Sequence, residues 1–345
     1  MKREAGDPPV SCQEAGLAGS PREQGRAERP LGSTLAGWAR SIWREYSVAL
    51  VFLLFAGVAS FLSPYFFTRS NLANVLRQVS DIGIVAAGEM LVIVTGGIDL
   101  SVGSVVAMAS VLSMMVQGSG VAAMFGAGLA AGVAAGWING LLVTRGRVAP
   151  FVATLAMMAM AKGVALIATS GQPVYGPYAE TFFYWLGNGH LLGLSTPIVL
   201  LLLTYGLGHF VLRYTAFGRN LLAVGGNEEA ARLAGVRVDR VKLAAYTLSG
   251  LTAAVGSLLI TSRMNTGSPI AGSFYELDAI AAVVVGGASL SGGRGSFVGT
   301  FFGLLILGTI ANVLNLLNVS PYFQYLARGL IIVAAVLLQR RQGTT

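Results

Sequence analysis

Long apolar runs, separated by short polar or glycine-rich stretches, fill the sequence from residue 46 onward. Most of these runs approach the roughly 20 residues that an α-helix needs to cross the hydrocarbon core of a bilayer. Charged and turn-forming residues end each run, and the pattern predicts an all-α integral membrane protein with about ten transmembrane helices. The expected spans are residues 46–66, 82–97, 102–117, 121–143, 150–169, 195–212, 243–260, 277–290, 297–317 and 322–338.

Two of the expected spans, 82–97 and 277–290, are short and contain glycines. They either cross the membrane or fold back inside it. An even number of spans places both termini on the same side of the membrane, and this conclusion holds even if both short segments are re-entrant.

The basic residues indicate which side that is. Among the 23 Lys and Arg residues, Arg69, Arg77 and Arg263 lie on the side opposite the termini, and Lys162 and Arg328 lie within spans. All the others lie on the side of the termini. Because Lys and Arg in short loops are retained in the cytoplasm, we expect both termini to be cytoplasmic. The net charge of +8 therefore follows membrane topology and does not indicate binding of nucleic acid.

One polytopic domain is expected to make up most of the chain. Residues 1–32 are rich in Gly, Pro, Glu and Arg and are expected to form a disordered cytoplasmic tail. The apolar spacing of residues 33–45 predicts an interfacial helix that leads into the first span. No apolar signal-peptide core precedes residue 47. The transmembrane domain is expected at 46–340, with a cytoplasmic segment at 213–242 and a short tail at 341–345.

The fourth expected span carries a stripe of glycines at intervals of four residues. On a helix such a stripe allows a second helix to approach to backbone contact in lipid. We interpret it as a helix-packing surface rather than as part of a transport pathway. The stripe consists of Gly128, Gly132, Gly136 and Gly140.

Two glycine-broken segments resemble each other: Met90–Gly103 (MLVIVTGGIDLSVG) and Ile280–Gly293 (IAAVVVGGASLSGG). Broken spans at corresponding positions of two halves indicate a translocation site, because freed backbone groups survive at membrane depth only beside protein or water. A simpler interpretation, compatible with the first, is that Asp99, Ser101 and Ser291 cap the helices that follow. The candidates for a broken-helix pathway are Glu89, Thr95, Gly96, Gly97, Asp99, Ser101, Gly286, Gly287 and Ser291.

Glu89 and Lys162 are ionisable residues inside predicted spans. Such groups cost several kcal/mol unless they are paired or hydrated. A buried pair between the two is the favoured interpretation, and a polar pathway lined by Glu89 is the alternative. Because so few charges lie within the spans, a net-neutral polar solute is easier to accommodate than an ion.

The polar segment 213–242 contains the pattern of a short helix, NEEAARLAG at 227–235. Asn227 is suited to the N-cap, and Glu228 and Glu229 are suited to the positive end of the helix dipole. Gly235 is suited to the position after the C-terminus. From these residues alone, an ordinary solvated connector is the preferred interpretation.

Composition excludes most other classes of function. The chain is 54% hydrophobic and 11% charged, whereas soluble domains carry about 25% charged residues. The single cysteine, Cys12, excludes an intramolecular disulfide, and because the chain has only two histidines and few acids, we expect no metal site in the spans. No GxxxxGK[ST] phosphate loop and no catalytic constellation occurs. We therefore expect no catalytic residue and no enzymatic activity.

Three motifs carry a resemblance to a known family: GEMLVIVTGGIDLSVGSVVAM (Gly88–Met108), AVGGNEEAARLAGV (Ala223–Val236) and AIAAVVVGGASLSGGRGSFVGTFFG (Ala279–Gly303). Together they closely resemble the membrane permeases of bacterial monosaccharide ABC importers, of the ribose, xylose, arabinose and galactoside type. The similarity covers about residues 46–340, and only the long N-terminal tail departs from it.

The resemblance implies a homodimer in the lipid of the bacterial inner membrane, joined to a cytoplasmic ABC ATPase and a periplasmic sugar-binding protein. It implies that the ATPase binds ATP and Mg and that this chain holds no cofactor. Glu229, Ala230, Ala231 and Gly235 match the EAA---G pattern of importer permeases, which reverses the connector interpretation. The implied ATPase-coupling helix consists of Asn227, Glu228, Glu229, Ala230, Ala231 and Gly235.

The expected function is therefore ATP-driven import of a neutral, ribose- or xylose-like monosaccharide by alternating access. A related permease for autoinducer-2, a nucleoside or a branched-chain amino acid is an alternative within the same class. An autonomous secondary sugar transporter also fits repeated broken helices. Its ion-coupling site would have to use Glu89, Asp99 and Lys162.

Overall fold

The computed structural model describes residues 31–176 and 181–320, together with residues 322, 323, 326, 329, 330 and 333. Side chains are described from Ser47 onward. The chain divides into two units, Met1–Trp43 and Arg44–Thr345, and the packing given below is that of the second. Residues 1–30 and 341–345 of the expected tails, and most of the span expected at 322–338, lie outside the described residues.

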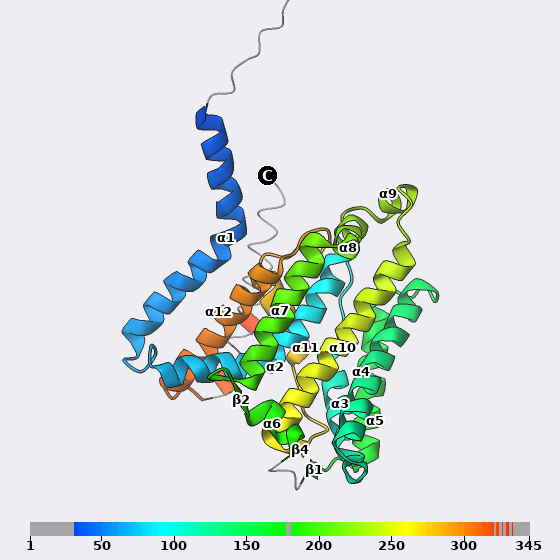
Figure 1. Cartoon of the computed structure of the whole chain (residues 1–345). Helices are drawn as coiled ribbons and strands as arrows, with labels where there is room; N and C mark the ends of the chain where they lie inside the picture. Colours follow the sequence, from blue (N-terminus) through cyan, green and yellow to red (C-terminus); the bar gives the residue numbers. More distant parts are fainter. Residues whose placement is uncertain are drawn as a thin grey trace, which may run out of the picture. The chain divides into compact units, whose positions relative to one another are not determined.

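Helices make up most of the described chain (Figure 1). In chain order they are α1 (Leu31–Leu62), α2 (Arg69–Val94), α3 (Val102–Met115), the 3-10 turn η1 (Gln117–Ser119), α4 (Val121–Thr144), α5 (Pro150–Thr169), α6 (Phe182–Asn188), α7 (Thr196–Tyr214), α8 (Ala216–Gly226), α9 (Glu228–Leu233), α10 (Val238–Met264), α11 (Tyr275–Val285) and α12 (Phe297–Leu316). The short strand β1 (Val174–Tyr175) pairs antiparallel with β4 (Thr266–Gly267), and β2 (His190–Leu191) pairs antiparallel with β3 (Leu194–Ser195).

Five of these helices are long and apolar enough to cross a membrane: α4, α5, α7, α10 and α12. The segment Ser47–Leu62 of α1 and the helix α3 are shorter apolar helices. The spans predicted at 102–117, 121–143, 150–169, 195–212 and 297–317 coincide with α3, α4, α5, α7 and α12 to within two residues at each end. The described residues thus form an all-α membrane fold with several crossing helices.

The prediction for α2 was wrong at its start. The helix begins at Arg69, not at residue 82, and its 26 residues make it long rather than short. Arg77 and Asp81 had ended the apolar run, but both find distant partners. Arg77 Nη2 donates to Asn188 Oδ1 at 2.7 Å, and Asp81 Oδ2 pairs with Arg263 Nη2 at 2.8 Å. A hydropathy pattern cannot reveal these partners, because they lie far away in the sequence.

Three other differences concern one end of α11, one end of α10 and the presence of α8. The helix α11 stops at Val285, before the glycines at 286 and 287, and its 11 residues span about 16 Å of a hydrocarbon core that is about 30 Å thick. This length favours the re-entrant alternative for 277–290. The helix α10 begins at Val238 rather than at 243. The helix α8 fills part of the segment 213–242, where only the short helix at 227–235 had been predicted.

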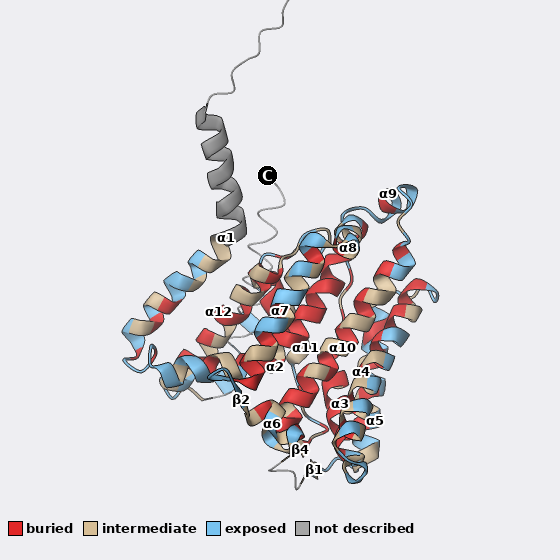
Figure 2. Ribbon diagram, in the orientation of Figure 1, coloured by how far each residue is buried: buried red, intermediate tan, exposed pale blue. Residues whose placement is uncertain are grey.

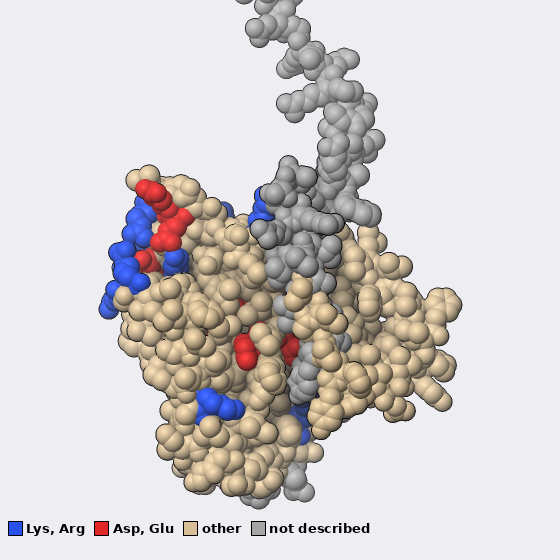
Figure 3. Space-filling view, turned by 180° about the vertical axis from the view of Figure 1, so that it is seen from behind, with Lys and Arg blue, Asp and Glu red and all other residues tan. Residues whose placement is uncertain are grey.

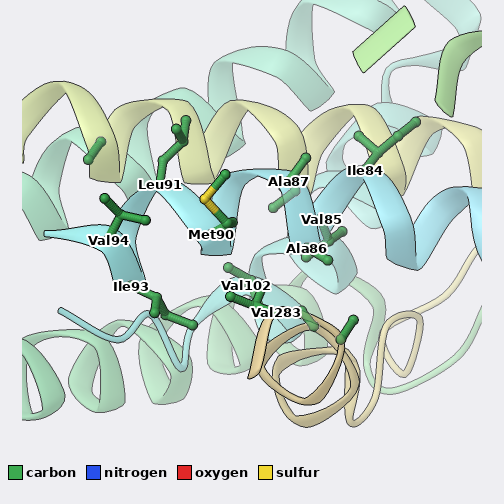
Figure 4. Packing of buried hydrophobic residues seen from close by; sticks show 14 of the residues in the cluster. Ile84, Val85, Ala86, Ala87, Met90, Leu91, Ile93, Val94, Val102 and Val283 are labelled. Atoms are coloured by element: carbon green, nitrogen blue, oxygen red, sulfur yellow. The ribbon is translucent and has the colours of Figure 1, made fainter. Parts of the chain in front are cut away.

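The core of the second unit lies around the C-terminal half of α2 and around α10. The helix α10 packs against α2, α3 and α4, and α11 packs against α2 and α12. Buried residues follow these elements, whereas exposed apolar residues are common on α1 and α5 (Figure 2). In the close view the apolar side chains of α2 point to opposite sides of the helix, with Val102 of α3 and Val283 of α11 beside them (Figure 4).

The glycine stripe of α4 lies against α10. A Cβ atom added at Gly132 would overlap the Gly250 carbonyl oxygen and lie 2.6 Å from the Ala254 Cβ atom. An added Cβ at Gly136 would lie 3.0 Å from the Gly250 nitrogen. At either end of the stripe, Gly128 faces Leu258 and Gly140 faces Leu243. Small residues on both helices therefore allow the two backbones to touch, as in close-packed membrane helix pairs.

Gly132→Ala should destabilise the protein by about 1–3 kcal/mol, because the new methyl group forces α4 and α10 apart. Gly126→Ala is the matched control, since Gly126 lies in the same helix with open space around it. The midpoint of thermal unfolding of purified protein in detergent measures the difference. Equal midpoints for the two variants would contradict a packing role for the stripe.

Candidate functional site

The helix α2 ends at Val94, and the chain then runs back along the last turns of α2 before α3 begins at Val102. We call this interruption of the helix the first break. Thr95 is the C-cap of α2, and Gly96 follows it with a φ of +81°. Glycine adopts this left-handed conformation without the steric cost that a side chain brings. Gly97 allows a second close approach, because a Cβ atom there would overlap the Tyr246 hydroxyl oxygen of α10. The two glycines therefore shape the turn.

Side chains replace the helical hydrogen bonds that the break removes. The Asp99 backbone N–H donates to Glu89 Oε1 at 3.1 Å, and the Ser101 backbone N–H donates to Asp99 Oδ1 at 3.0 Å. Thr154 of α5 donates from its hydroxyl to the Ile98 carbonyl oxygen at 3.2 Å. Because an unsatisfied backbone group in hydrocarbon costs several kcal/mol, these contacts make the break possible at depth.

A second layer of polar side chains holds those acceptors. Ser249 Oγ of α10 donates to Asp99 Oδ2 at 3.0 Å, and Asn139 Nδ2 of α4 donates to Ser101 Oγ at 2.9 Å. Ser101 Oγ itself donates to Asp99 Oδ1 at 2.6 Å. We call Glu89, Asp99, Ser101, Asn139 and Ser249 the buried polar cluster, since none of them is more than 1% exposed. The cluster joins α2, α4 and α10 to the break.

Asn139 and Ser249 were missed by the sequence reading. Asn139 lies in an otherwise apolar stretch of α4, between two glycines of the stripe, whereas Ser249 is one of several hydroxyl residues along α10. The position of Asn139 inside a span was the available signal, because a polar side chain in hydrocarbon needs a partner. The sequence does not say which partner that is.

Capping explains less of the break than expected. Ser101 occupies the N-cap position of α3 but makes no side-chain capping bond there. The prediction for Ser291 was wrong, since Ser296 is the N-cap of α12 and its side chain accepts from the Gly299 backbone N–H. Asp99 accepts from the N–H of Ser101 and thereby fixes the approach to α3 rather than its first turn.

The second broken segment has the same outline with different chemistry. Gly286 is the C-cap of α11, and Gly287 follows with a φ of +87°. In the repeat Gly287 corresponds to Gly97, whereas the glycine with positive φ in the first copy is Gly96, one residue earlier. The hydrogen bonds of this break are made by serine and backbone groups: Ser289 Oγ accepts from the Ser291 backbone N–H, and the Ser289 backbone N–H donates to the Arg294 carbonyl oxygen. The two segments therefore share their outline and their glycines, whereas Glu89 and Asp99, which accept hydrogen bonds from the backbone of the first break, belong to the first copy.

The favoured pair between Glu89 and Lys162 is not formed. Lys162 Nζ donates to the Pro269 carbonyl oxygen at 2.8 Å, whereas Glu89 holds the Asp99 N–H. The sequence separation between Glu89 and Lys162 does not indicate which partner each residue has in the fold. Glu89 Oε2 makes no hydrogen bond within the described residues, and the same is true of Asn139 Oδ1 and the Tyr246 hydroxyl.

The polar segment 213–242 folds into α8, α9 and the first turns of α10. Asn227 is the N-cap of α9, and its Oδ1 accepts from the Ala230 N–H at 2.9 Å. Gly235 has a φ of +83°, which lets the Val236 N–H reach back to the Ala231 carbonyl oxygen. The sequence analysis predicted that the helix ends at Gly235 because glycine favours the left-handed conformation after a helix C-terminus, and this is the conformation that Gly235 adopts.

Most of α9 is exposed to solvent. Ala231 is buried, but Glu229 and Ala230 are exposed and Leu233 is 85% exposed. A pocket of about 270 Å³ between α9 and α10 is lined by Arg232, Val236, Arg237, Val238, Asp239 and Arg240. Figure 3 shows acidic and basic side chains gathered at the end of the molecule where Figure 1 places α9. Such a protruding helix with a charged surround is suited to contact with a protein partner.

Glu228 ties α9 to α10. Its carboxylate accepts from Lys242 Nζ at 2.5 Å and from Arg232 Nη2 at 3.1 Å. The hydrogen bond from Lys242 lowers the pKa of the Glu228 carboxyl below its ordinary value, and the positive charges of Lys242 and Arg232 act in the same direction. The Glu228 carboxylate that links α9 to α10 is therefore charged at neutral pH.

Comparison with known families gives a match over residues 71–336 to the branched-chain amino acid transport system, permease component. Among curated proteins, the chain is 46% identical to the ribose import permease protein RbsC of Bacillus subtilis over 288 residues, covering 83% of this chain and 89% of that protein. It is 42% identical to RbsC of Escherichia coli K12, covering 86% of this chain and 94% of that protein. The L-arabinose transport system permease protein AraH of E. coli K12 is 43% identical, with 87% and 91% covered. No solved structure matches.

Among the described residues, no group of three or more His, Cys, Asp or Glu side chains is placed to hold a metal ion.

Glu89→Ala should destabilise the protein by about 1–3 kcal/mol, because the Asp99 N–H loses its acceptor in a buried site. Glu89→Gln keeps a carbonyl oxygen at that place and should cost less. Thermal unfolding in detergent measures both, with Glu229→Ala on exposed α9 as the control. Equal loss in the Ala and Gln variants would show that Glu89 acts through its charge rather than as an acceptor.

Acidification should loosen α9. Because folding lowers the pKa of Glu228, its contribution to stability is present above the unfolded value of about 4.3 and is lost as pH falls through the folded value. Amide hydrogen exchange of residues 228–236, corrected for the intrinsic rate, should therefore accelerate below about pH 4.3. Glu228→Gln should show faster exchange at neutral pH and little further change on acidification. If exchange in Glu228→Gln still accelerates on acidification, a titrating group other than Glu228 causes the pH response.

Proposed function

Because the chain belongs to the family of permease components of the branched-chain amino acid transport system type, we propose that it is the membrane subunit of an ATP-binding cassette importer for a neutral monosaccharide. The observation that carries the proposal is its extensive similarity to ribose and arabinose permeases. The chain itself provides the path across the membrane. It does not carry a phosphate-binding loop of the GxxxxGK[ST] type.

The chemistry of the core is consistent with a neutral solute. The buried polar cluster presents hydroxyl, amide and carboxylate groups, and none of its five members is cationic. A sugar exchanges hydrogen bonds with water for hydrogen bonds with such groups without carrying a charge into the bilayer. Of the broken-helix candidates, Glu89, Asp99 and Ser101 belong to this cluster, whereas Gly96, Gly97, Gly286 and Gly287 shape the turns. The Thr95 hydroxyl donates to the Val92 carbonyl oxygen in the last turn of α2 at 2.7 Å.

Energy is supplied from outside the chain. We propose that two copies form a homodimer, with both termini cytoplasmic in the bacterial inner membrane, and that a separate ATPase binds ATP and Mg. The exposed helix α9 is the contact with that ATPase, and its coupling residues are Asn227, Glu228, Glu229, Ala230, Ala231 and Gly235. A periplasmic sugar-binding protein delivers the solute on the opposite side.

Alternating access then follows from displacement of α9. The helix is short, is capped at both ends and is tied to α10 by Glu228, so that it moves as a unit. Displacing α9 tilts α8 and α10, to which it is directly connected. ATP binding by the partner and the solute's unequal affinity for the two states supply the bias between inward- and outward-open forms.

Two rival functions make different use of the same fold. An autonomous secondary transporter needs an ion-coupling site, for which Glu89, Asp99 and Lys162 were the candidates. Lys162 does not join the two acids, which removes one of the three from a common site. A permease for autoinducer-2, a nucleoside or a branched-chain amino acid would share the mechanism, and only solute competition separates these alternatives.

Proteoliposomes that contain the permease, its ATPase and its binding protein should accumulate labelled ribose, arabinose or xylose only when ATP is supplied. Uptake by the permease alone, driven by a proton or sodium gradient, would instead establish the secondary transporter. Unlabelled nucleoside, leucine and autoinducer-2 are added as competitors. Competition by one of these and by none of the sugars would change the solute class.

Gly235→Val should abolish coupled uptake while leaving the protein in the membrane, because a β-branched residue is strained at a φ of +83°. Glu229→Lys should act similarly by reversing the charge at the exposed N-terminal turn. Gly118→Val, at a glycine with open space, and Glu229→Gln are the controls. ATP-dependent uptake and the amount of assembled complex are measured together. Normal uptake in both test variants would refute the role of α9.

A further inference from the structure

Three chain segments far apart in the sequence meet in backbone contact beside the first break. They are the end of α2, the glycines after the second break, and the last turn of α8. The Gly293 backbone N–H donates to the Val94 carbonyl oxygen at 2.9 Å, which joins the two breaks directly. We call Val94, Gly96, Gly225, Gly292 and Gly293 the glycine junction.

Three glycines of the junction, Gly225, Gly292 and Gly293, have no room for a side chain. A Cβ atom added at Gly225 would overlap the Val94 carbonyl oxygen and lie 2.5 Å from the Gly293 nitrogen. One added at Gly292 would lie 2.8 Å from both the Gly225 carbonyl oxygen and the Gly96 nitrogen. Real Cβ atoms essentially never come within 3.0 Å of such neighbours. Three backbones therefore touch, and no flexible side chain lies between them.

Gly225 connects this junction to α9 by a very short path. It lies in the last turn of α8, two positions before Asn227, which caps α9. The Asn227 N–H donates to the Ala223 carbonyl oxygen at 3.1 Å, so that the helical bonding of α8 continues to the start of α9. Leu221 and Val224 anchor α8 in the core. In contrast, Gly226 is exposed, and an added Cβ there would have nothing within 4 Å.

The junction also leads to the buried polar cluster. Val94 ends the helix that carries Glu89, and Gly96 begins the return segment that carries Asp99. A shift of the Val94 carbonyl is therefore transmitted to both ends of the hydrogen bond between Glu89 and the Asp99 N–H. Through Gly293 the same contact reaches the segment between α11 and α12.

We propose that Gly225 is a positioning residue that transmits displacement of α9 to both glycine breaks through the glycine junction. This inference rests on the proposed function, in which an ATPase moves α9. Direct backbone contact is suited to the task, because closely packed groups move together, whereas a side chain between them can change rotamer and absorb the motion.

The test compares Gly225→Ala with Gly226→Ala, its neighbour in the same helical turn. Both are reconstituted with the ATPase and the binding protein. Uptake per assembled complex, basal ATP hydrolysis, and the stimulation of hydrolysis by sugar-loaded binding protein are measured. Gly225→Ala should reduce uptake and stimulation by at least about tenfold, within the usual size of a coupling between two sites. Its basal hydrolysis should remain, and Gly226→Ala should match the unmodified protein in every measurement.

A second variant covers the case in which Gly225→Ala fails to accumulate. One glycine inserted between Gly226 and Asn227 changes none of the junction residues, lies in an exposed position and lengthens the connection to α9. This variant should assemble, hydrolyse ATP and lose uptake. Uptake per complex equal to that of Gly226→Ala, in either Gly225→Ala or the insertion variant, would overturn the proposal.

The unmodified complex separates this proposal from the one on which it rests. If it shows no ATP-dependent sugar uptake, the proposed function fails. If it transports sugar and the two variants transport it equally well, the proposed function stands and the role of Gly225 fails.

Discussion

The structure depends on one constraint: a backbone that leaves its helix inside a membrane must find hydrogen bonds from its own protein. After α2 the chain does so through Glu89, which accepts from the Asp99 N–H, and through Asp99, which accepts from the Ser101 N–H. The acids in the middle of this apolar fold thus act first as acceptors for the main chain. The free-energy cost of burying these acids is offset by the hydrogen bonds that they accept from the backbone of the break.

The same constraint explains why α4 and α10 carry the buried polar residues Asn139 and Ser249 beside a stripe of glycines. The glycines of α4 bring its backbone against α10, and this close approach places Asn139 and Ser249 around Asp99 and Ser101. A wider helix pair would leave those groups without partners. Close packing and polar satisfaction are therefore two aspects of one arrangement.

Glycine has a different use on the side of α9. There it removes side chains from the contacts between Gly225, Gly293 and Val94, so that the connection between the exposed helix and the core is made by backbone atoms. In the function proposed above, the energy source is a separate subunit, and this backbone contact is the route by which its motion reaches the core. The fold combines an apolar body, a polar interior and one protruding charged helix.

Apolar run length alone determined the all-α membrane class and placed α4, α5, α7 and α12 correctly, because hydropathy and helix capping are local properties. The NEEAARLAG pattern likewise fixed α9, with Asn227 and Gly235 at its ends. Pairing of side chains was decided by tertiary structure. Lys162 meets a carbonyl oxygen rather than Glu89, Asn139 and Ser249 join the break, and distant partners allow α2 to start at Arg69. Each of these outcomes depends on which helices become neighbours, and that is set by the packing of whole surfaces rather than by any local stretch of residues.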